Sequence, residues 1–341
     1  MKRHLQTTRG LISVTLAIAA LLGVSLGFWS CSRQDDLEKV ESITVGYPPF
    51  ESATLFYIAE DQGFFSRNGL KMAPRKYDTG VATLGGLLNR EIDVAAGIAE
   101  FPLVGRALQK EKPIIIGNID KAEFIYLLGR KDRGIEKVSD LRGKRVGTTF
   151  GTVAHFHLGR FLDLHGMSIK DLTLVDLKTP EEWVNAVVTG DIDAVATAQP
   201  YADFVKDRLG ENGVVWPAQS GQPLHGLVIS SNAWISRHPE GTKRFLESLA
   251  DAEGYLISHP AEAKVILQKW LNLDAASVER IWSRNQFSLS LDQSLIVAME
   301  DEARWMIRNK LTSEETVPNF MDYVQEDTLK AISPHAVTII R

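Results

Sequence analysis

The sequence predicts an α/β protein built as two Rossmann-like lobes with a ligand cleft between them. Strand-like and helix-like patterns alternate along the body of the chain, and this alternation repeats after roughly one hundred residues. The composition, 44% hydrophobic and 24% charged, is ordinary for a globular protein with a sizeable core. A body of about 310 residues is long enough for about two domains.

The first 31 residues differ from the body, and we expect residues 1–31 to be a signal peptide. Lys2, Arg3 and Arg9 give the segment a basic start, and Leu11–Trp29 is an uncharged, mostly apolar run. This layout is typical of an export signal.

The only cysteine, Cys31, comes directly after Ser30 at the end of the apolar run. The segment Phe28-Trp29-Ser30-Cys31 resembles the lipobox of bacterial lipoproteins, although Phe28 stands where that pattern usually has Leu. The resemblance implies that Cys31 is lipidated. An uncleaved membrane anchor is the alternative, because about 20 apolar residues span a bilayer. Both interpretations place the body in the periplasm or on the outer face of the cytoplasmic membrane.

Charge and motifs exclude several classes of function. The formal net charge of −5 is spread along the chain, without the basic stripe that would indicate a nucleic-acid partner. The sequence has no Gly-x-Ser-x-Gly elbow, no His-Glu-x-x-His metal site and no phosphate-binding Gly-x-x-x-x-Gly-Lys loop. We expect no catalytic residues, no metal and no cofactor, and we also expect the protein to be a monomer.

The first half of the repeat begins with an apolar strand that ends at a glycine. Further elements follow in alternation, which predicts βαβ units and a largely parallel sheet. In order, the patterns predict a strand at Ile43–Gly46, a helix at Ala53–Phe65, an extended segment at Leu70–Tyr77, a helix at Val81–Asn89 and a strand at Ile92–Ala96.

The second half repeats this order. Val45-Gly46 returns as Val146-Gly147, and Glu91–Ala95 returns as Asp191–Val195. We expect residues 42–126 to begin lobe one, 127–221 to form lobe two, and 222–341 to return to lobe one and add the C-terminal helices. The return is predicted to contain a strand at Leu227–Ser230 and helices at Thr242–Ser258, Ala261–Leu271, Ala275–Arg284 and Gln293–Asn309.

Several segments in this order resemble the solute-binding proteins of ABC importers for aliphatic sulfonates, taurine, nitrate and thiamine-precursor pyrimidines. The resemblance covers roughly Ile43–Leu291, and it implies a type II periplasmic-binding-protein fold and an ABC transporter permease as partner. The segments that carry it are Phe56–Ala59, Gly63–Phe65, Gly69-Leu70, Asp78–Gly80, Asp140–Gly147, Gly190–Ala194 and Pro200-Tyr201.

The clearest candidate site is the start of a helix that follows the strand Arg145–Thr149. A helix start carries unpaired backbone N–H groups and positive partial charge, so it is suited to an oxyanion. The equivalent segment in the resembling family contacts the acidic group of the ligand. Simple N-capping by Thr152 is the alternative. The segment consists of Gly151, Thr152, Val153, Ala154 and His155.

Lobe one offers two comparable helix starts and an aromatic loop. The starts are Ser52, Ala53 and Thr54 before one helix, and Asp78, Thr79 and Gly80 before the next. The loop holds Tyr47, Pro48 and Phe50, which either pack on an apolar tail of the ligand or form an ordinary aromatic turn.

Four polar residues complete the candidate binding set. Gln199, beside Tyr201, stands where many members of the resembling family have an acid, and a neutral side chain argues against an amino-sulfonate ligand. Glu100 is a candidate acid at the cleft, with a solvated loop glutamate as the alternative. His225 lies at the predicted return crossing and either contacts ligand or forms the hinge.

The expected function is a substrate-binding lipoprotein of an ABC importer that captures a small organic anion by closure of its lobes. An alkanesulfonate is the first choice of ligand, and a thiamine-precursor pyrimidine is the second. An enzyme on the same fold and a membrane-anchored sensor remain as alternatives from other classes.

Overall fold

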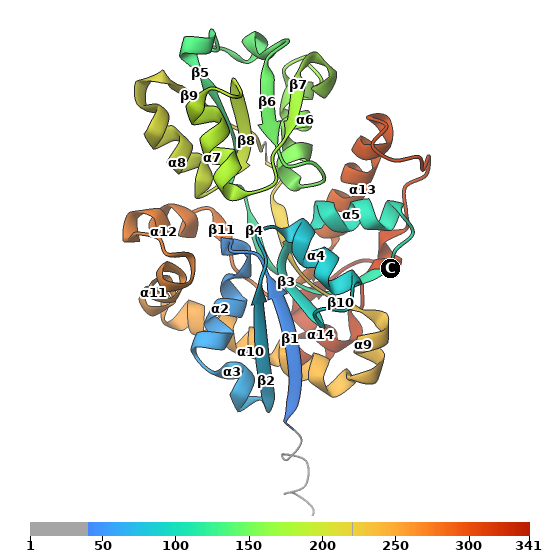
Figure 1. Ribbon diagram of the computed structural model, residues 1–341. Coiled ribbons are helices and arrows are strands. Elements are labelled where there is room, and N and C mark those ends of the chain that lie inside the picture. The colour runs from blue at the N-terminus through green and yellow to red at the C-terminus, as the bar shows by residue number, and fades with distance from the viewer. Residues whose placement is uncertain (1–39, 220) are drawn as a thin grey trace, which may run out of the picture. The chain divides into compact units, whose positions relative to one another are not determined.

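The computed structural model describes residues 40–219 and 221–341. Residues 42–341 form one compact unit. The segment predicted to be a signal peptide, Cys31 and most of the segment that follows lie outside the described residues. Two mixed sheets carry helices on their faces, so the α/β class is confirmed (Figure 1).

The first sheet has six strands in the order β11-β4-β10-β3-β1-β2. Its strands come from both ends of the described chain, because residues after 223 return to pair beside the earlier strands. The bounds are β1 Glu41–Tyr47, β2 Leu70–Lys76, β3 Val94–Ala99, β4 Pro113–Ala122, β10 Leu224–Ser231 and β11 Asn285–Gln286.

The second sheet has five strands in the order β7-β6-β8-β5-β9, all from the middle of the chain. A separate pair, β12 Leu291–Asp292 and β13 Val337–Thr338, joins two C-terminal segments. The bounds of the five are β5 Ile125–Arg130, β6 Arg145–Thr148, β7 Thr173–Asp176, β8 Ala194–Ala198 and β9 Gly213–Pro217.

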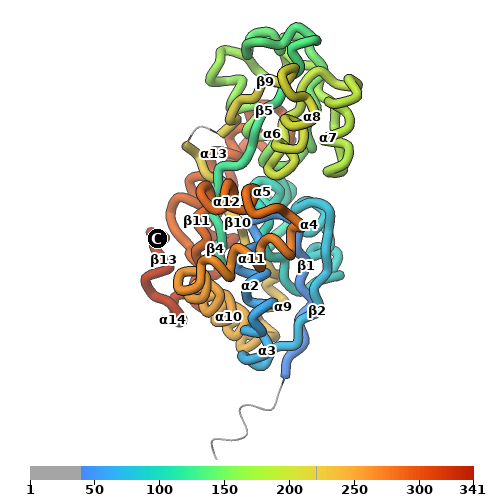
Figure 2. Tube along the Cα trace, turned by 90° about the vertical axis from the view of Figure 1, so that its left-hand side faces the viewer, coloured from blue at the N-terminus to red at the C-terminus, as the bar shows by residue number. Residues whose placement is uncertain are grey.

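The expectation of a largely parallel sheet is wrong for the strands that connect the two sheets. β1 pairs with β3 in parallel, and β6 pairs with β7 and β8 in parallel. In contrast, β10 is antiparallel to β3 and β4, and β5 is antiparallel to β8 and β9. The chain leaves the first sheet through β4 into β5 and returns through β9 into β10 (Figure 2). Outgoing and returning strands that lie side by side must run in opposite directions.

Every helix predicted from the sequence is present, and one of them is interrupted. The helix expected over Ala53–Phe65 is split into α2 and α3 at Gly63, whose φ of 67° is left-handed. The α-helices are α2 Thr54–Asp61, α3 Phe64–Arg67, α4 Gly80–Leu88, α5 Glu100–Leu108, α6 Val153–Leu164, α7 Pro180–Thr189, α8 Tyr201–Leu209, α9 Asn232–Arg237, α10 Pro239–Ser258, α11 Pro260–Leu271, α12 Ala275–Trp282, α13 Gln293–Arg308 and α14 Asp327–Ile332. The 3-10 turns are η1 Glu51–Ala53, η2 Lys131–Arg133, η3 Val138–Leu141, η4 Ile169–Asp171, η5 Gly210–Asn212, η6 Phe320–Tyr323 and η7 Pro334–Ala336.

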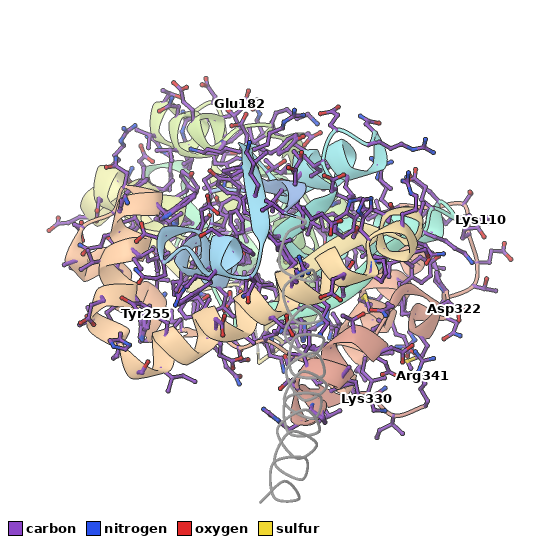
Figure 3. The ribbon with its side chains drawn as sticks, turned by 90° about the horizontal axis from the view of Figure 1, so that it is seen from below. Lys110, Glu182, Tyr255, Asp322, Lys330 and Arg341 are labelled. Atoms are coloured by element: carbon purple, nitrogen blue, oxygen red, sulfur yellow. The ribbon has the colours of Figure 1, made fainter. Side chains whose placement is uncertain are left out.

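The C-terminal helices α10 and α11 pack against α2, and α14 packs against α10 and β4. In the view from below, α10, which carries Tyr255, runs across the molecule, and the chain end at Arg341 lies beside Lys330 of α14 (Figure 3). Arg341 pairs with Glu326 at 2.7 Å, which holds this end against the body.

One C-terminal helix, α13, also packs against α6, the helix that contacts β5 and β8 of the second sheet. Trp305 of α13 is 1% exposed and lies against Gly159 of α6, where a Cβ would be only 2.2 Å from Cζ2 of the indole. The ion pair between Arg308 and Asp163, at 3.0 Å, lies between the same two helices. The glycine is therefore required for the close approach of α13 and α6 in this structure.

Candidate functional site

A cavity of about 70 Å³ is lined by residues from both sheets. At roughly 10–15 Å³ for each water by this measure, it has room for about five water molecules. No residue in its lining carries a charged side chain. The lining consists of Pro48, Phe50, Ser52, Thr79, Gly80, Val81, Gly97, Ala99, Pro102, Phe124, Ile125, Thr149, Thr152, Val153, Ala154, Trp183, Ala196, Thr197 and Ala198.

The start of α6 presents unpaired backbone amides at this cavity. Thr152 is the N-cap residue, but its hydroxyl donates to the carbonyl of Thr149 at 2.7 Å and does not cap the helix. The alternative of simple side-chain capping is therefore wrong. The amides of Val153 and Ala154 line the cavity without a hydrogen-bond partner in the described chain, so they are available to an acceptor on a ligand.

The start of α4 makes a similar arrangement from the first sheet. Thr79 caps this helix by accepting from the amide of Ala82 at 3.1 Å. The amides of Gly80 and Val81 have no partner among the described residues and belong to cavity-lining residues. Two helix starts from different sheets thus bring positive partial charge to one uncharged cavity.

The hydroxyl groups of the lining differ in their availability. Ser52 donates to the carbonyl of Gly97 at 2.7 Å. Thr149 donates to the carbonyl of Leu177 at 2.7 Å and accepts from the indole of Trp183 at 2.8 Å. In contrast, Thr197 is 2% exposed, and its hydroxyl has no partner within the described residues. This hydroxyl is free to donate to, or accept from, a bound molecule.

Aromatic rings form part of the apolar wall. Phe50 and Trp183 stack with centroids 6.4 Å apart and an interplanar angle of 15°. The predicted site residue Tyr201 lies outside the cavity lining and meets both rings edge-on, at 6.3 Å and 5.2 Å between centroids. Sequence reasoning missed Trp183, because a tryptophan at helical core spacing gives no sign of whether its ring faces the core or a cavity.

Six of the predicted site residues line the cavity: Ser52, Thr79, Gly80, Thr152, Val153 and Ala154. Tyr47 lies outside the lining and packs against the rings of Phe56, Tyr57 and Trp270.

Three neighbours of the lining residues also lie outside it. Ala53 is buried behind Gly97, where an added Cβ would lie 2.6 Å from Cβ of Ala53. Thr54 is buried and donates to the carbonyl of Glu51 at 2.6 Å. Asp78 is exposed to solvent.

The structure places Glu100, at the start of α5, and His225, in β10, outside the cavity lining. Glu100 is 1% exposed, and its carboxylate accepts from the backbone amide of His225 at 2.9 Å. A ring nitrogen of His225 meets the hydroxyl of Ser294 at 3.2 Å. The expectation of a cleft-facing acid at Glu100 is therefore not supported, and its alternative, a solvated loop glutamate, is wrong. Glu100 opens the buried α5, which the local sequence did not predict.

Gly151 and His155 line a separate groove beside the cavity. The imidazole of His155 stacks on Phe150 with centroids 5.0 Å apart. Burial lowers the pKa of His155 to about 4 and that of His157 to about 3, so both rings are neutral at physiological pH. Gln199 lines a second, smaller cavity that also involves Glu51.

The described residues contain neither a membrane-spanning helix nor a cluster suited to a metal ion. No helix within residues 40–219 and 221–341 is long and apolar enough to cross a membrane. The same residues hold no cluster of three or more His, Cys, Asp or Glu side chains suited to a metal ion.

The chain has two sheets and a cavity lined by residues from both. Comparison with solved structures confirms the periplasmic-binding-protein fold. The alkanesulfonate-binding protein SsuA from Xanthomonas axonopodis pv. citri, bound to MOPS, superimposes with a TM-score of 0.73 at 21% identity. The match covers 84% of this chain and 98% of SsuA.

Residues 51–263 match the model of the NMT1/THI5 like family, and the chain belongs to that family. It is similar to the taurine-binding periplasmic protein of Escherichia coli (strain K12), with 25% identity over 64% of this chain and 68% of that protein. It is also similar to an enzyme, the 4-amino-5-hydroxymethyl-2-methylpyrimidine phosphate synthase of Aspergillus parasiticus, with 24% identity over 61% and 64% of the two chains.

Proposed function

We propose that this chain is the exported solute-binding protein of an ABC importer and that it captures a small organic anion of the alkanesulfonate type. The observation that carries the proposal is the uncharged cavity where the free amides of two helix starts meet the free hydroxyl of Thr197. Similarity to a taurine-binding protein and to SsuA supports the same class of ligand.

An acidic head group would accept hydrogen bonds from the helix starts. Val81 and Gly80 offer amides from α4, and Val153 and Ala154 offer amides from α6. A hydrogen bond to a charged group contributes about 1.5–3 kcal/mol. Three or four of them are comparable with the ~8 kcal/mol of micromolar binding before the costs of ordering and desolvation.

The rest of the ligand would pack on the apolar wall. Phe50, Trp183 and Phe124 supply ring surfaces, and their burial on an alkyl group is favourable at about 25 cal/mol for each Å² removed from water. The helix α4 packs on the first sheet and α6 packs on the second. A ligand that binds both helix starts therefore favours the state in which the lobes are closed. We assign residues 42–126 and 222–341 to lobe one and residues 127–221 to lobe two, so that one boundary falls within β5 and the other between β9 and β10.

A lipid anchor would keep the body near the permease of the importer. We propose that residues 1–31 direct export and that Cys31 carries a lipid, so that the body works as a monomer in the periplasm or at the outer face of the cytoplasmic membrane. The partner is then the permease of the importer. Loss of membrane fractionation in a Cys31→Ala variant, with the body still exported, is the expected result.

A thiamine-precursor pyrimidine is the second candidate ligand. The stacked rings of Phe50 and Trp183 suit a flat heterocycle, and one relative is a pyrimidine phosphate synthase. The two candidate ligands differ in the hydrogen-bond donors that they need: an alkanesulfonate needs the free amides of the two helix starts, and a neutral pyrimidine does not.

Isothermal titration of the body, residues 32–341, with alkanesulfonates, pyrimidines and carboxylates tests the proposal. Sulfonate binding that weakens about tenfold in Thr197→Val is the expected result, since that variant removes one hydrogen bond to a charged group. Thr148→Val is the matched control: its hydroxyl is equally buried and without a partner in the described chain, but it does not line the cavity. Binding of pyrimidines alone would reject the sulfonate assignment.

A further inference from the structure

Two helices outside the ligand cavity join the two lobes. The helix α6 contacts β5 and β8 of the second sheet, and α13 packs on α5, which contacts β4 and β10 of the first sheet. In the assignment above, α6 belongs to lobe two and α13 belongs to lobe one (Figure 1). Contacts between α6 and α13 are therefore contacts between the lobes.

Each helix uses one face for these contacts. Residues three, four and seven positions after Phe156 lie on the same side of α6, and residues four and seven positions after Asp301 share a side of α13. We define the α6–α13 interface by these seven residues: Phe156, Gly159, Arg160 and Asp163 of α6, and Asp301, Trp305 and Arg308 of α13.

The centre of the interface is aromatic and buried. Trp305 is 1% exposed, and its indole lies across Gly159 and meets the ring of Phe156 edge-on, with centroids 5.5 Å apart. Phe101 of α5 stacks on Phe156 at 5.6 Å, so lobe one holds this ring from two helices. Separation of α6 from α13 would expose these ring faces to water, which is unfavourable.

Two ion pairs lie at the edge of the interface. Arg308 of α13 pairs with Asp163 of α6 at 3.0 Å, and Arg160 of α6 pairs with Asp301 of α13 at 3.7 Å. Each helix thus gives one base and one acid. All four side chains are at least one third exposed, so each pair adds little stability by itself. Reversal of one charge, however, would place like charges against each other across the lobes.

The α6–α13 interface is separate from the ligand cavity. None of its seven residues lines that cavity or the smaller cavity beside Glu51. The lobes also meet at the ion pair between Arg280 of α12 and Asp203 of α8, at 3.0 Å, but both of these residues line the smaller cavity. Changes at the α6–α13 interface can therefore alter the contact between the lobes without altering a contact with a ligand.

We propose that the α6–α13 interface forms when the lobes close and separates when they open, so that its residues determine ligand affinity without contacting the ligand. This inference rests on the proposed function in one respect, that the protein binds by closure of its lobes. The apparent affinity of a ligand falls with the fraction of protein in the binding-competent state. A weaker interface lowers the closed fraction, and it should weaken every ligand by the same factor.

Charge reversal at the edge of the interface tests this inference. Arg308→Asp places a carboxylate against Asp163 and should weaken binding of ethanesulfonate and of butane-1-sulfonate by the same factor, about threefold, in calorimetric titration. The double variant Arg308→Asp with Asp163→Arg restores an ion pair and should recover most of the affinity. Arg304→Asp is the matched control, because Arg304 is a similarly exposed arginine of α13 that pairs with Glu300 of the same helix.

The closed fraction can also be measured without a ligand. The body, residues 32–341, contains no cysteine, so spin labels can be attached to cysteines introduced at the exposed positions Glu211 of lobe two and Glu262 of lobe one. Pulsed electron paramagnetic resonance then gives the distribution of distances between the lobes. Arg308→Asp should shift the distribution of the ligand-free protein away from that of the wild type, and the double variant should reverse the shift.

The two measurements separate this inference from the proposed function. Identical distance distributions in the wild type and Arg308→Asp would overturn the inference, since the two helices would then form a fixed joint. A loss of affinity that differs between the two sulfonates would place the effect in the cavity and would also overturn it. If neither sulfonate binds but the distances still shift, the assigned ligand class is rejected and the role of the interface in closure is supported.

Discussion

Replacement of Glu51 by Gln should change how the stability of the protein depends on pH. The carboxyl is completely buried without a partner in the described chain, and burial raises its pKa from 4.5 to about 8. Below pH 4.5 the group is protonated in both the folded and the unfolded state. As pH rises, the unfolded chain ionises first, so the wild type loses stability until the folded-state pKa is reached.

The size of this effect follows from the gap between the two pKa values. At about 1.36 kcal/mol per pH unit, the gap from 4.5 to about 8 corresponds to about 5 kcal/mol. Gln is a neutral isostere, so the variant lacks this loss. The difference in unfolding free energy, variant minus wild type, should rise from near zero at pH 4 to about 5 kcal/mol at pH 8.5.

Urea unfolding at a series of pH values, followed by tryptophan fluorescence, measures this difference. Titrating groups that Glu51 does not influence cancel in the comparison, whereas the raised pKa values of Asp120, Tyr57 and Tyr201 depend in part on Glu51 and change with it. Glu181→Gln, at an exposed position of α7, is the control and should follow the wild-type curve. Parallel curves for wild type and Glu51→Gln would refute the reasoning, since they would mean that Glu51 ionises freely in the folded state.

Three further changes have expected outcomes. Gly159→Ala places a Cβ 2.2 Å from the buried indole of Trp305, and we expect urea unfolding to show a loss of about 1–3 kcal/mol. Gly97→Ala meets Cβ of Ala53 at 2.6 Å at a φ of 75°, so it should lower both stability and ligand affinity in titration. Burial lowers the pKa of the His157 imidazole from 6.5 to about 3, so the wild type loses unfolding free energy as pH falls below 6.5. His157→Leu should remove this loss, which amounts to about 5 kcal/mol at pH 3.

The first of these variants has a control, and the other two each have a result that would contradict the expectation. Gly254→Ala, at a helical glycine with open space around it, should be neutral or stabilising, and a loss equal to that of Gly159→Ala would remove the steric argument. A Gly97→Ala variant with wild-type affinity would show that η1 shifts without effect on the cavity. An unchanged acid profile in His157→Leu would show that the buried imidazole accepts a proton without unfolding.

The sequence by itself determined the fold class, the order of many elements and two of the helix starts that line the cavity. These features depend on local information: the period of apolar residues, a glycine after a strand, and a hydroxyl residue before a helix. Thr79, Gly80 and the segment Thr152–Ala154, which these local signals predict to be ligand-binding residues, line the cavity.

Only the tertiary structure decided which polar side chains meet at the site. Glu100 and Glu51 each lie at the start of a short helical segment, and nothing local separates them. Folding gives Glu100 the backbone amide of His225, from a strand far along the chain, and leaves Glu51 with none. Whether a buried carboxylate has a partner depends on residues that are distant in sequence, and for that reason the pattern of one segment cannot determine it.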